Sequence, residues 1–390
     1  MNLIADKFTV AHCTAHYIRT QAELDRTTNY LATCAELAID LEFDRNRYRY
    51  GFNMCLIQIE ANDIIYIIDP VNSEIRNYQA LWNILENPDI LKIMHSPNED
   101  ISLLKIQGCS LRNLGDTEFG ARLQNIKTVS LGALLELFLE IKLDKDQQTS
   151  NWNHRPLSIS QMMYAAYDVV YLRRLYYKIM ETVPPERVPW HTELCAELES
   201  TFYEADPDAY RKLLDWRIAT EYDYFIAKRL HEWRENVAKQ LNSPPASVIA
   251  NAMLADWANT PLEGFDNWLT IKGLPHKLRT EHHYRNYKNM LDNARKEATE
   301  KGLKTVWMRP PPHKYVRTRE DAEYLKEAFR NFRTFLREKY GETVATLMLS
   351  ATHCEAMISG KSFNDIRHFA QDHVRASAVE FGLDLEKYEL

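Results

Sequence analysis

The sequence predicts an α/β domain with a central sheet, followed by all-helical domains. Short runs rich in Ile and Leu alternate with helical patterns up to about residue 110. From about residue 158 the apolar and charged residues recur only at helical spacing. The length also matters, because 390 residues are too many for one small core and favour two or three domains.

The first strands are predicted between residues 36 and 70. Their sequences are LAID, MCLIQIE and IIYIIDP, and Ala61-Asn62-Asp63 between the last two is typical of a hairpin turn. A helix is expected over YQALWNILENPDI, a strand over LKIMHS, and a helix through EDISLLKIQG that ends at Gly108. Strands that alternate with helices in this way indicate one sheet covered by helices.

The helical part is predicted to begin at a capping box. Ser158 and Gln161 have the S-x-x-Q spacing that starts a helix near Ile159, and Pro184-Pro185 should end it. The proline-rich RPPPHKY segment (309–315) is expected to be a linker. We therefore expect an α/β domain over residues 1–205, a helical domain over 206–295, and a linker with a second helical domain over 296–390.

The amino-acid composition and the spacing of the cysteines exclude several classes of protein. A hydrophobic fraction of 45% with 26% charged residues is typical of a soluble globular chain. No apolar run is long enough to cross a bilayer, and the N-terminal sequence lacks the features of a secretion signal, so we expect no membrane and a cytoplasmic location. The cysteines form no C-x-x-C pair, which argues against a zinc ribbon or a disulfide scaffold; they are Cys13, Cys34, Cys55, Cys109, Cys195 and Cys354.

An Asp-x-Glu tripeptide occurs twice, as Asp40/Glu42 and as Asp384/Glu386. Alternate residues of a strand point to the same face, so Asp40 and Glu42 would lie side by side and offer oxygen ligands to a divalent cation. An unpaired carboxylate in a central strand is costly unless something binds it. Asp384 follows a glycine close to Leu390, and we expect that copy to be a solvated tail.

Further acidic residues follow at positions that could complete a metal site with Asp40 and Glu42. Asp100 comes just after the LKIMHS strand, at the start of a helix. Tyr164 and Asp168 are at i and i+4 of the capped helix and share one face. None of the other 20 tyrosines has an Asp four residues later. Taken singly, Tyr164 could be a core aromatic and each Asp a surface acid.

Together these residues resemble the DEDD-type 3′–5′ exonucleases, and within them ribonuclease D. The resemblance extends over roughly residues 15–180 and includes FDRNRY, LIQIE, IIDP, HSPNEDI, LDKDQQTSNW, RPLS and YAAYDVVYL. It implies a ribonuclease H-like fold with a mixed central sheet flanked by helices. It also implies that His95 is not a metal ligand.

The resemblance implies hydrolysis of the terminal phosphodiester at an RNA 3′ end, with release of nucleoside monophosphates by a two-metal mechanism. Two divalent cations, Mg²⁺ or Mn²⁺, would be held by Asp40, Glu42, Asp100 and Asp168. Tyr164 would orient the attacking water. The implied substrate is RNA with a single-stranded 3′ end, in tRNA or stable-RNA processing with tRNA precursors as the example, acted on by a monomer. Substrate contacts would come from Arg45, Arg47 and Lys145.

The helical half resembles an HRDC domain in SVIANAMLADWA, Pro261 and IKGL, and the C-terminal segment resembles a degenerate second copy. Trp216, Trp257 and Trp268 are expected to be core residues. The net charge of −7 argues against a general nucleic-acid binder, but local patches matter more than the sum. One such patch could hold nucleic acid or could be an ordinary solvated helix face; it comprises Lys272, Lys277, Arg279, Arg285 and Lys288.

Two other functions stay open at this point. The same carboxylates could hydrolyse DNA, because discrimination of ribose depends on contacts to the 2′-hydroxyl. The chain could also be a non-catalytic nucleic-acid-binding module.

Overall fold

The computed structural model describes residues 7–71, 73–143, 149–201, 206, 208–215, 219–306, 319–360, 363 and 368–385. Contacts between residues divide the chain into two compact units. Unit 1 comprises Met1–Glu42, Met54–Tyr203 and Lys314–Leu390. Unit 2 comprises Phe43–Asn53 and Glu204–His313.

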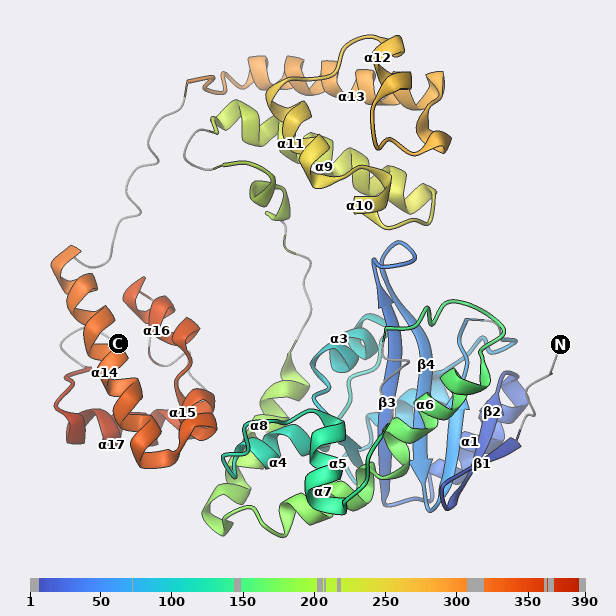
Figure 1. Cartoon of the computed structure of the whole chain (residues 1–390), viewed down its shortest axis with the longest axis vertical. Coiled ribbons are helices and arrows are strands. Elements are labelled where there is room, and N and C mark those ends of the chain that lie inside the picture. Colours follow the sequence, from blue (N-terminus) through green and yellow to red (C-terminus); the bar gives the residue numbers. More distant parts are fainter. Residues whose placement is uncertain are drawn as a thin grey trace. The chain divides into compact units, whose positions relative to one another are not determined.

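The described part of unit 1 is built on a mixed sheet with strand order β1-β2-β5-β4-β3-β6-β7 (Figure 1). The pairs β2–β5, β3–β6 and β6–β7 are parallel, whereas β1–β2 and β4–β5 are antiparallel. The strands are β1 (Lys7–Val10), β2 (Cys13–Ile18), β3 (Glu36–Arg45), β4 (Phe52–Ala61), β5 (Ile64–Ile68), β6 (Leu91–Met94) and β7 (Leu114–Asp116). The predicted mixed sheet is confirmed.

The hairpin predicted between β4 and β5 is confirmed. Asn62 and Asp63 both have positive φ angles, 48° and 66°, as the two central residues of a tight hairpin turn require. The sequence analysis placed no strand at β1, β2 or β7. β1 is an edge strand with exposed Lys7 and Thr9, so it lacks an apolar run, and β7 has only three residues.

Helices surround this sheet, and α6 crosses in front of the strands in Figure 1. They are α1 (Gln21–Leu31), α2 (Gln79–Leu85), α3 (Asn98–Ile106), α4 (Thr117–Arg122), α5 (Leu131–Leu139), α6 (Ile159–Val170), α7 (Leu172–Met180) and α8 (Val188–Ser200). Among the described residues, every helix is too short or too polar to cross a bilayer.

The capping box at Ser158 and Gln161 is confirmed, because each side chain accepts a hydrogen bond from the backbone N–H of the other residue. The single helix expected from there to Pro184 is wrong. The helix breaks at Tyr171, with φ −110° and ψ −4°, into α6 and α7. α6 contacts β1 and β5, whereas α7 contacts α4, α5 and β6, so the break lets one apolar segment pack in two directions.

Outside residues 43–53, the regular structure in the described part of unit 2 is helical. Its helices are α9 (Glu221–Gln240), α10 (Pro245–Val248), α11 (Asn251–Asn259), α12 (Phe265–Thr270) and α13 (Glu281–Glu300). The aromatic residues Trp233, Trp257, Trp268 and Tyr287 meet in its core, and the Trp268 indole donates to the carbonyl of Leu278 at 2.8 Å. The core positions predicted for Trp257 and Trp268 are thus confirmed, and Trp216 lies outside the described residues.

The C-terminal helices of unit 1 are α14 (Arg319–Tyr340), α15 (Glu342–Met348), α16 (Ala351–Ile358) and α17 (His368–Phe381). Asn125, beyond α4, fixes their attachment: its amide donates to the Tyr340 carbonyl at 2.8 Å and accepts from the Val344 N–H at 3.3 Å. The predicted linker at 309–315 lies outside the described residues.

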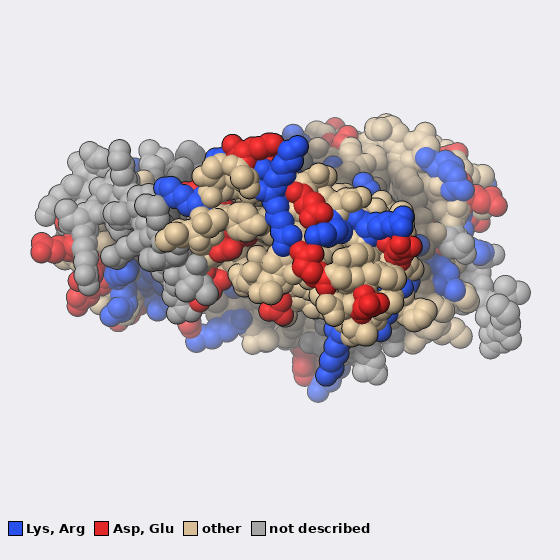
Figure 2. All heavy atoms as spheres, turned by 90° about the horizontal axis from the view of Figure 1, so that it is seen from above, with Lys and Arg blue, Asp and Glu red and all other residues tan. Residues whose placement is uncertain are grey.

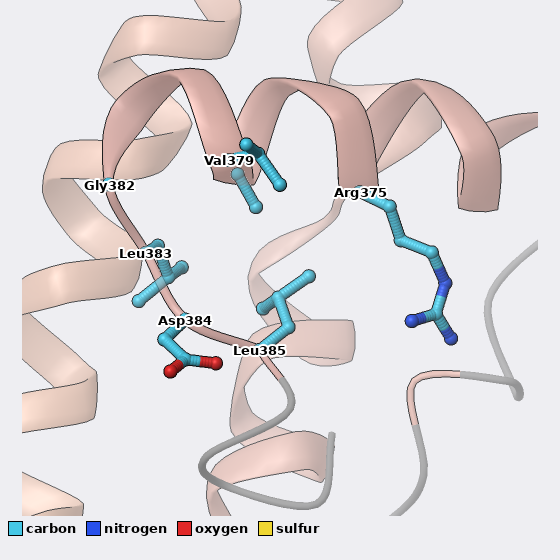
Figure 3. A pocket seen from close by; sticks show the side chains of 7 residues that line it. Arg375, Val379, Gly382, Leu383, Asp384 and Leu385 are labelled. Carbon is cyan, nitrogen blue, oxygen red and sulfur yellow. The ribbon is translucent and has the colours of Figure 1, made fainter.

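A cavity of about 470 Å³ lies beside α17, between Arg375, Val379 and the segment that follows Gly382 (Figure 3). Asp384, from the second Asp-x-Glu tripeptide, lines it and is exposed. This agrees with the solvated position expected for Asp384; Glu386 lies outside the described residues.

Candidate active site

Three carboxylates converge over the middle of the sheet. Asp40 and Glu42 alternate along β3, which lies between β4 and β6, so both side chains leave the same face. Asp168 from α6 joins them, and one oxygen from each of the three acids lies within 4.8 Å of the others. All three are half-buried.

Asp100 reaches the same place from the neighbouring parallel strand. β3 and β6 run side by side with Ala38 opposite Ile93, so the end of β6 comes level with the middle of β3. α3 starts shortly afterwards and carries the buried Asp100 in its first turn, where the helix dipole favours a negative charge. The backbone N–H of Leu41 lowers the pKa values of both Asp40 and Asp100, but burial outweighs this effect.

Helix α6 positions Tyr164 and Asp168 one turn apart. Its capping box fixes where the helix starts, and its apolar side packs inward through Met162, Ala165 and Val169. Tyr164 and Asp168 therefore lie together along the adjacent face. The Trp152 ring lies 6.0 Å from the Tyr164 ring, centroid to centroid, and supports it from the side.

Burial and mutual repulsion disfavour the charged carboxylates. Burial raises the pKa of Asp40 to about 7. Burial first, and then the charges of Asp40, Asp168 and Asp100, raise the pKa of Glu42 well above its usual value. The same two causes raise the pKa values of Asp100 and Asp168. A cation placed among these oxygens would relieve the repulsion and restore the ionised state.

Tyr164 belongs to the same electrostatic environment. Burial raises its pKa above 10, and so do the charges of Asp168, Glu42 and Asp40. Its hydroxyl therefore stays protonated at neutral pH and can donate or accept a hydrogen bond, but it is unsuited to act as a base.

The donor set fits a divalent metal ion. It consists of carboxylate oxygens, and three of them are already close enough to converge on one ion. Hard dications such as Mg²⁺ and Mn²⁺ prefer oxygen ligands, whereas zinc more often recruits His or Cys. His95 is turned elsewhere: its Nδ1 lies 2.8 Å from the Thr117 hydroxyl, and burial lowers its pKa to about 4.

A buried ion pair anchors the segment that leads into α6. The Arg155 guanidinium donates to both carboxylate oxygens of Asp69 at 2.7 Å, and it also donates to the carbonyls of Cys55 and Trp152. Tyr17 donates to the same carboxylate. The sequence analysis assigned these residues no role. The sequence did contain a signal, because Asp69 lies in IIDP and Arg155 starts RPLS, two of the segments that carried the resemblance.

The structure places two of the three predicted substrate-binding residues. Arg45 is exposed at the end of β3, with its guanidinium 5.4 Å from the Phe52 ring centroid. Arg47 follows in the loop, with its guanidinium 5.3 Å from the Tyr48 ring. Lys145 lies outside the described residues. Contacts of these residues with a substrate stay a prediction.

The basic residues of the predicted patch in unit 2 take part in local structure. Arg279 donates to three backbone carbonyls, Arg285 pairs with Glu281 at 2.6 Å, and Lys288 pairs with Glu263 at 2.8 Å. Lys277 donates to Ser243 at 2.9 Å, and Lys272 is exposed. Figure 2 shows acidic and basic side chains interleaved over the visible face rather than a continuous basic surface. Binding of nucleic acid by this patch stays a prediction.

Comparisons with known proteins agree with this arrangement. Residues 15–184 match the family model described as 3′-5′ exonuclease. Ribonuclease D of Jannaschia sp. (strain CCS1) is 30% identical over 254 residues, which cover 63% of this chain and 65% of that protein. Ribonuclease D of Zymomonas mobilis subsp. mobilis is 30% identical over 267 residues, which cover 66% of this chain and 67% of that protein.

A solved structure shares the fold over nearly the whole chain. Escherichia coli RNase D superimposes with a TM-score of 0.71 and 20% identity, covering 94% of this chain and 99% of that chain. In sequence, the chain spans just under two thirds of the Jannaschia protein's length, 65%. The exonuclease match contains all five residues predicted from the sequence to form the site, and the chain belongs to the ribonuclease D family.

Proposed function

We propose that this chain is a metal-dependent 3′–5′ exoribonuclease that hydrolyses the terminal phosphodiester of RNA and releases nucleoside monophosphates. The observation that supports it most is the convergence of acids from β3, α3 and α6 beside the Tyr164 hydroxyl. Such a cluster of acids concentrates negative charge, so it suits cation-assisted attack on an anionic phosphate.

The four carboxylates, Asp40, Glu42, Asp100 and Asp168, would hold two divalent cations, Mg²⁺ or Mn²⁺. When bound, these ions supply the means to generate the nucleophile and to stabilise the leaving 3′-oxygen. Four acids are needed because one carboxylate cannot neutralise two dications. The mutual repulsion that raises the pKa values of these acids is what two cations would cancel.

Tyr164 would orient the attacking water through its protonated hydroxyl, one helical turn before Asp168. Tyr164→Phe is expected to lower kcat by roughly a hundredfold, the lower end of what a positioned proton-handling group contributes, with KM little changed. The measurement is steady-state release of nucleotides from a 3′-tailed RNA. The matched control is Tyr167→Phe on the same helix, whose ring stacks on Tyr171 instead. A wild-type kcat in Tyr164→Phe would show that Tyr164 takes no part in the reaction.

The proposed substrate is RNA with a single-stranded 3′ tail, such as a tRNA precursor, bound by a monomer. Escherichia coli RNase D is described as an exoribonuclease involved in structured RNA processing, which supports this choice. The helices over 206–295 and those after the linker would be HRDC-like domains that hold the RNA body. Arg45, Arg47 and Lys145 would guide the single strand toward the carboxylates.

The proposal is tested by digestion of matched RNA and DNA oligonucleotides with identical 3′ tails, each with Mg²⁺, Mn²⁺ or EDTA. We expect the RNA to shorten stepwise from its 3′ end with either metal and to stay intact in EDTA. Faster digestion of the DNA strand would instead identify a deoxyribonuclease. Absence of turnover on both strands with both metals would identify a binding module.

A further inference from the structure

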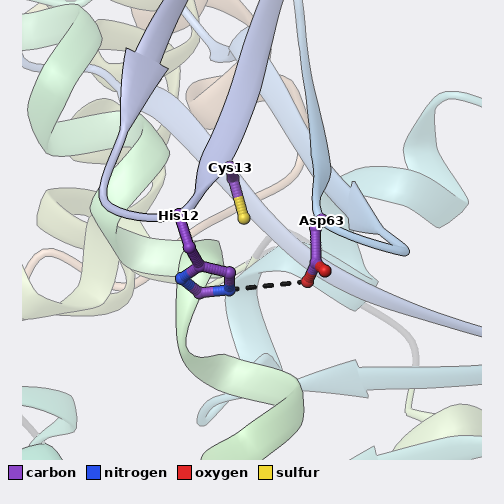
Figure 4. A group of neighbouring side chains, drawn as sticks. All are labelled: His12, Cys13 and Asp63. Carbon is purple, nitrogen blue, oxygen red and sulfur yellow. Dashed lines mark ion pairs between the residues drawn. The ribbon is translucent and has the colours of Figure 1, made fainter.

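A second set of possible metal ligands lies at the end of the sheet where β1 turns into β2. His12, Cys13 and Asp63 each offer one ligand atom, and these three atoms all lie within 4.8 Å of one another. The His12 Nε2 atom is 3.4 Å from Asp63 Oδ1. Figure 4 shows His12 from the β1–β2 turn, Cys13 from the start of β2 and Asp63 from the β4–β5 turn pointing toward one another, with the ion pair between His12 and Asp63.

The sheet register brings these residues together. β2 pairs with β5 in parallel, starting at Thr14 opposite Ile64, so the turn before β2 lies beside the turn before β5. The N–H of Thr14 donates to the Asp63 carbonyl at 3.2 Å and joins the two turns. Cys13 and Asp63 are each one residue before the first paired position, so they lie beside each other at this end of the sheet. His12 is supplied by the β1–β2 turn itself.

The surroundings favour a cation. Glu60 is buried at 1% exposure, and its Oε2 atom has no hydrogen-bond partner in the described part of the chain. Its register partner Ile65 also pairs with Ala15, two residues from Cys13 in β2, so Glu60 projects from the same face of the sheet as Cys13. Arg173 contacts Glu36, Glu60 and Asp63 at 3.2–3.4 Å, so one guanidinium faces three carboxylates.

We propose that His12, Cys13 and Asp63 form a transition-metal site of the zinc class, with solvent in the fourth position. One nitrogen, one thiolate and one carboxylate oxygen make a mixed donor set that suits Zn²⁺ and not Mg²⁺. Tetrahedral zinc holds neighbouring ligand atoms about 3.3–3.6 Å apart, given bonds of about 2.0–2.3 Å. The distance of 3.4 Å between His12 Nε2 and Asp63 Oδ1 already lies in this range. Small side-chain rotations would bring the Cys13 sulfur to a similar distance from these two atoms.

Arg173 contacts Asp63 Oδ1, the oxygen that faces His12, at 3.3 Å, and would then orient this carboxylate from outside the site. Outer hydrogen bonds of this kind orient a ligating carboxylate. Cys13 is 1% exposed, and its thiol must release its proton to solvent as the metal binds. The bonds from the metal ion to His12, Cys13 and Asp63 would join the β1–β2 hairpin to the β4–β5 hairpin.

The site is separate from the carboxylate cluster. Arg173 also pairs with Glu36, the first residue of β3, and Asp40 lies four residues farther along that strand. At the rise of a β-strand, four residues span about 13 Å. Binding at one site can therefore be measured while the other is filled.

The test is titration of the whole protein with Co²⁺ in excess Mg²⁺, followed by absorption spectroscopy. Mg²⁺ occupies the oxygen ligands, whereas Co²⁺ bound to a thiolate gives a sulfur-to-cobalt charge-transfer band in the near ultraviolet. We expect this band to saturate at a single equivalent. Cys13→Ser should abolish it, whereas Cys34→Ser, at another buried cysteine, should leave it unchanged.

If Cys13→Ser does not fold, His12→Gln provides a second test of the proposed site. The His12 side chain is 54% exposed in a turn, so its loss leaves the core intact. We expect Co²⁺ affinity to fall at least tenfold in His12→Gln and in Asp63→Asn. A wild-type protein without the band, a band that survives Cys13→Ser, or unchanged affinity in His12→Gln would overturn the proposal.

Discussion

Asp40→Asn is expected to lower the rate of nucleotide release from an RNA 3′ end by about a thousandfold or more. The variant keeps the shape of the side chain but removes one of the charges that would hold the cations. Metal ions contribute several kcal/mol to stabilising the transition state, and each 1.36 kcal/mol is tenfold in rate. The measurement is the initial rate of digestion with saturating Mn²⁺.

The chain supplies a matched control in its second Asp-x-Glu tripeptide. Asp384→Asn removes an exposed acid from the same tripeptide and should leave the rate unchanged. Asp40→Asn should also unfold no more easily than the wild type in EDTA, because it carries one fewer of four mutually repelling carboxylates. A wild-type rate in folded Asp40→Asn would mean that the site is wrongly assigned.

Arg155→Met is expected to destabilise the protein by about 3–5 kcal/mol, the usual effect of removing one partner from a buried ion pair. The Asp69 carboxylate is fully buried, and the Arg155 side chain is only 9% exposed. Without Arg155, the Asp69 carboxyl would lose the partner that offsets the cost of its burial. The free energy of unfolding from urea titration measures the loss.

The wild-type pair also has a defined pH dependence. Burial alone would raise the pKa of Asp69, but hydrogen bonds and charge from Arg155 outweigh this and hold it below its usual value. The pair therefore stabilises the fold above about pH 4 and loses this effect as pH falls through the folded-state pKa. Arg155→Met should show a weaker loss of stability over the same acidic range.

Arg174→Met is the control, because Arg174 is exposed on α7 and its replacement should change stability by no more than about 0.5 kcal/mol. Equal stability of Arg155→Met and Arg174→Met would show that the pair is not an anchor.

The cluster of side chains that forms the candidate site could be predicted from the sequence because its spacings are local. Asp40 and Glu42 are two residues apart on a strand, and Tyr164 and Asp168 are four apart on a capped helix, so each pair is placed by one element. The β4–β5 hairpin was equally local, since its turn residues tolerate positive φ. What the sequence could not supply was the packing that brings Asp100 and α6 to β3, and there the family resemblance was needed.

The sequence did not predict features that depend on contacts between residues far apart in the chain. His12 and Cys13 meet Asp63 only because β2 pairs with β5, and their spacing matches no familiar metal motif. The break at Tyr171 follows from the different partners of α6 and α7, which apolar periodicity does not record. In the same way, the basic residues from Lys272 to Lys288 did not indicate that Arg279 donates hydrogen bonds to backbone carbonyls.

Anomalous diffraction from crystals grown with Mn²⁺ tests the central claim most directly, since it locates bound ions without relying on activity. We expect two manganese peaks within coordinating distance, about 2.1 Å for such ions, of the carboxylate oxygens of Asp40, Glu42, Asp100 and Asp168. A saturated crystal with no peak at these side chains, or with Asp100 or Asp168 turned away from the peaks, would contradict it.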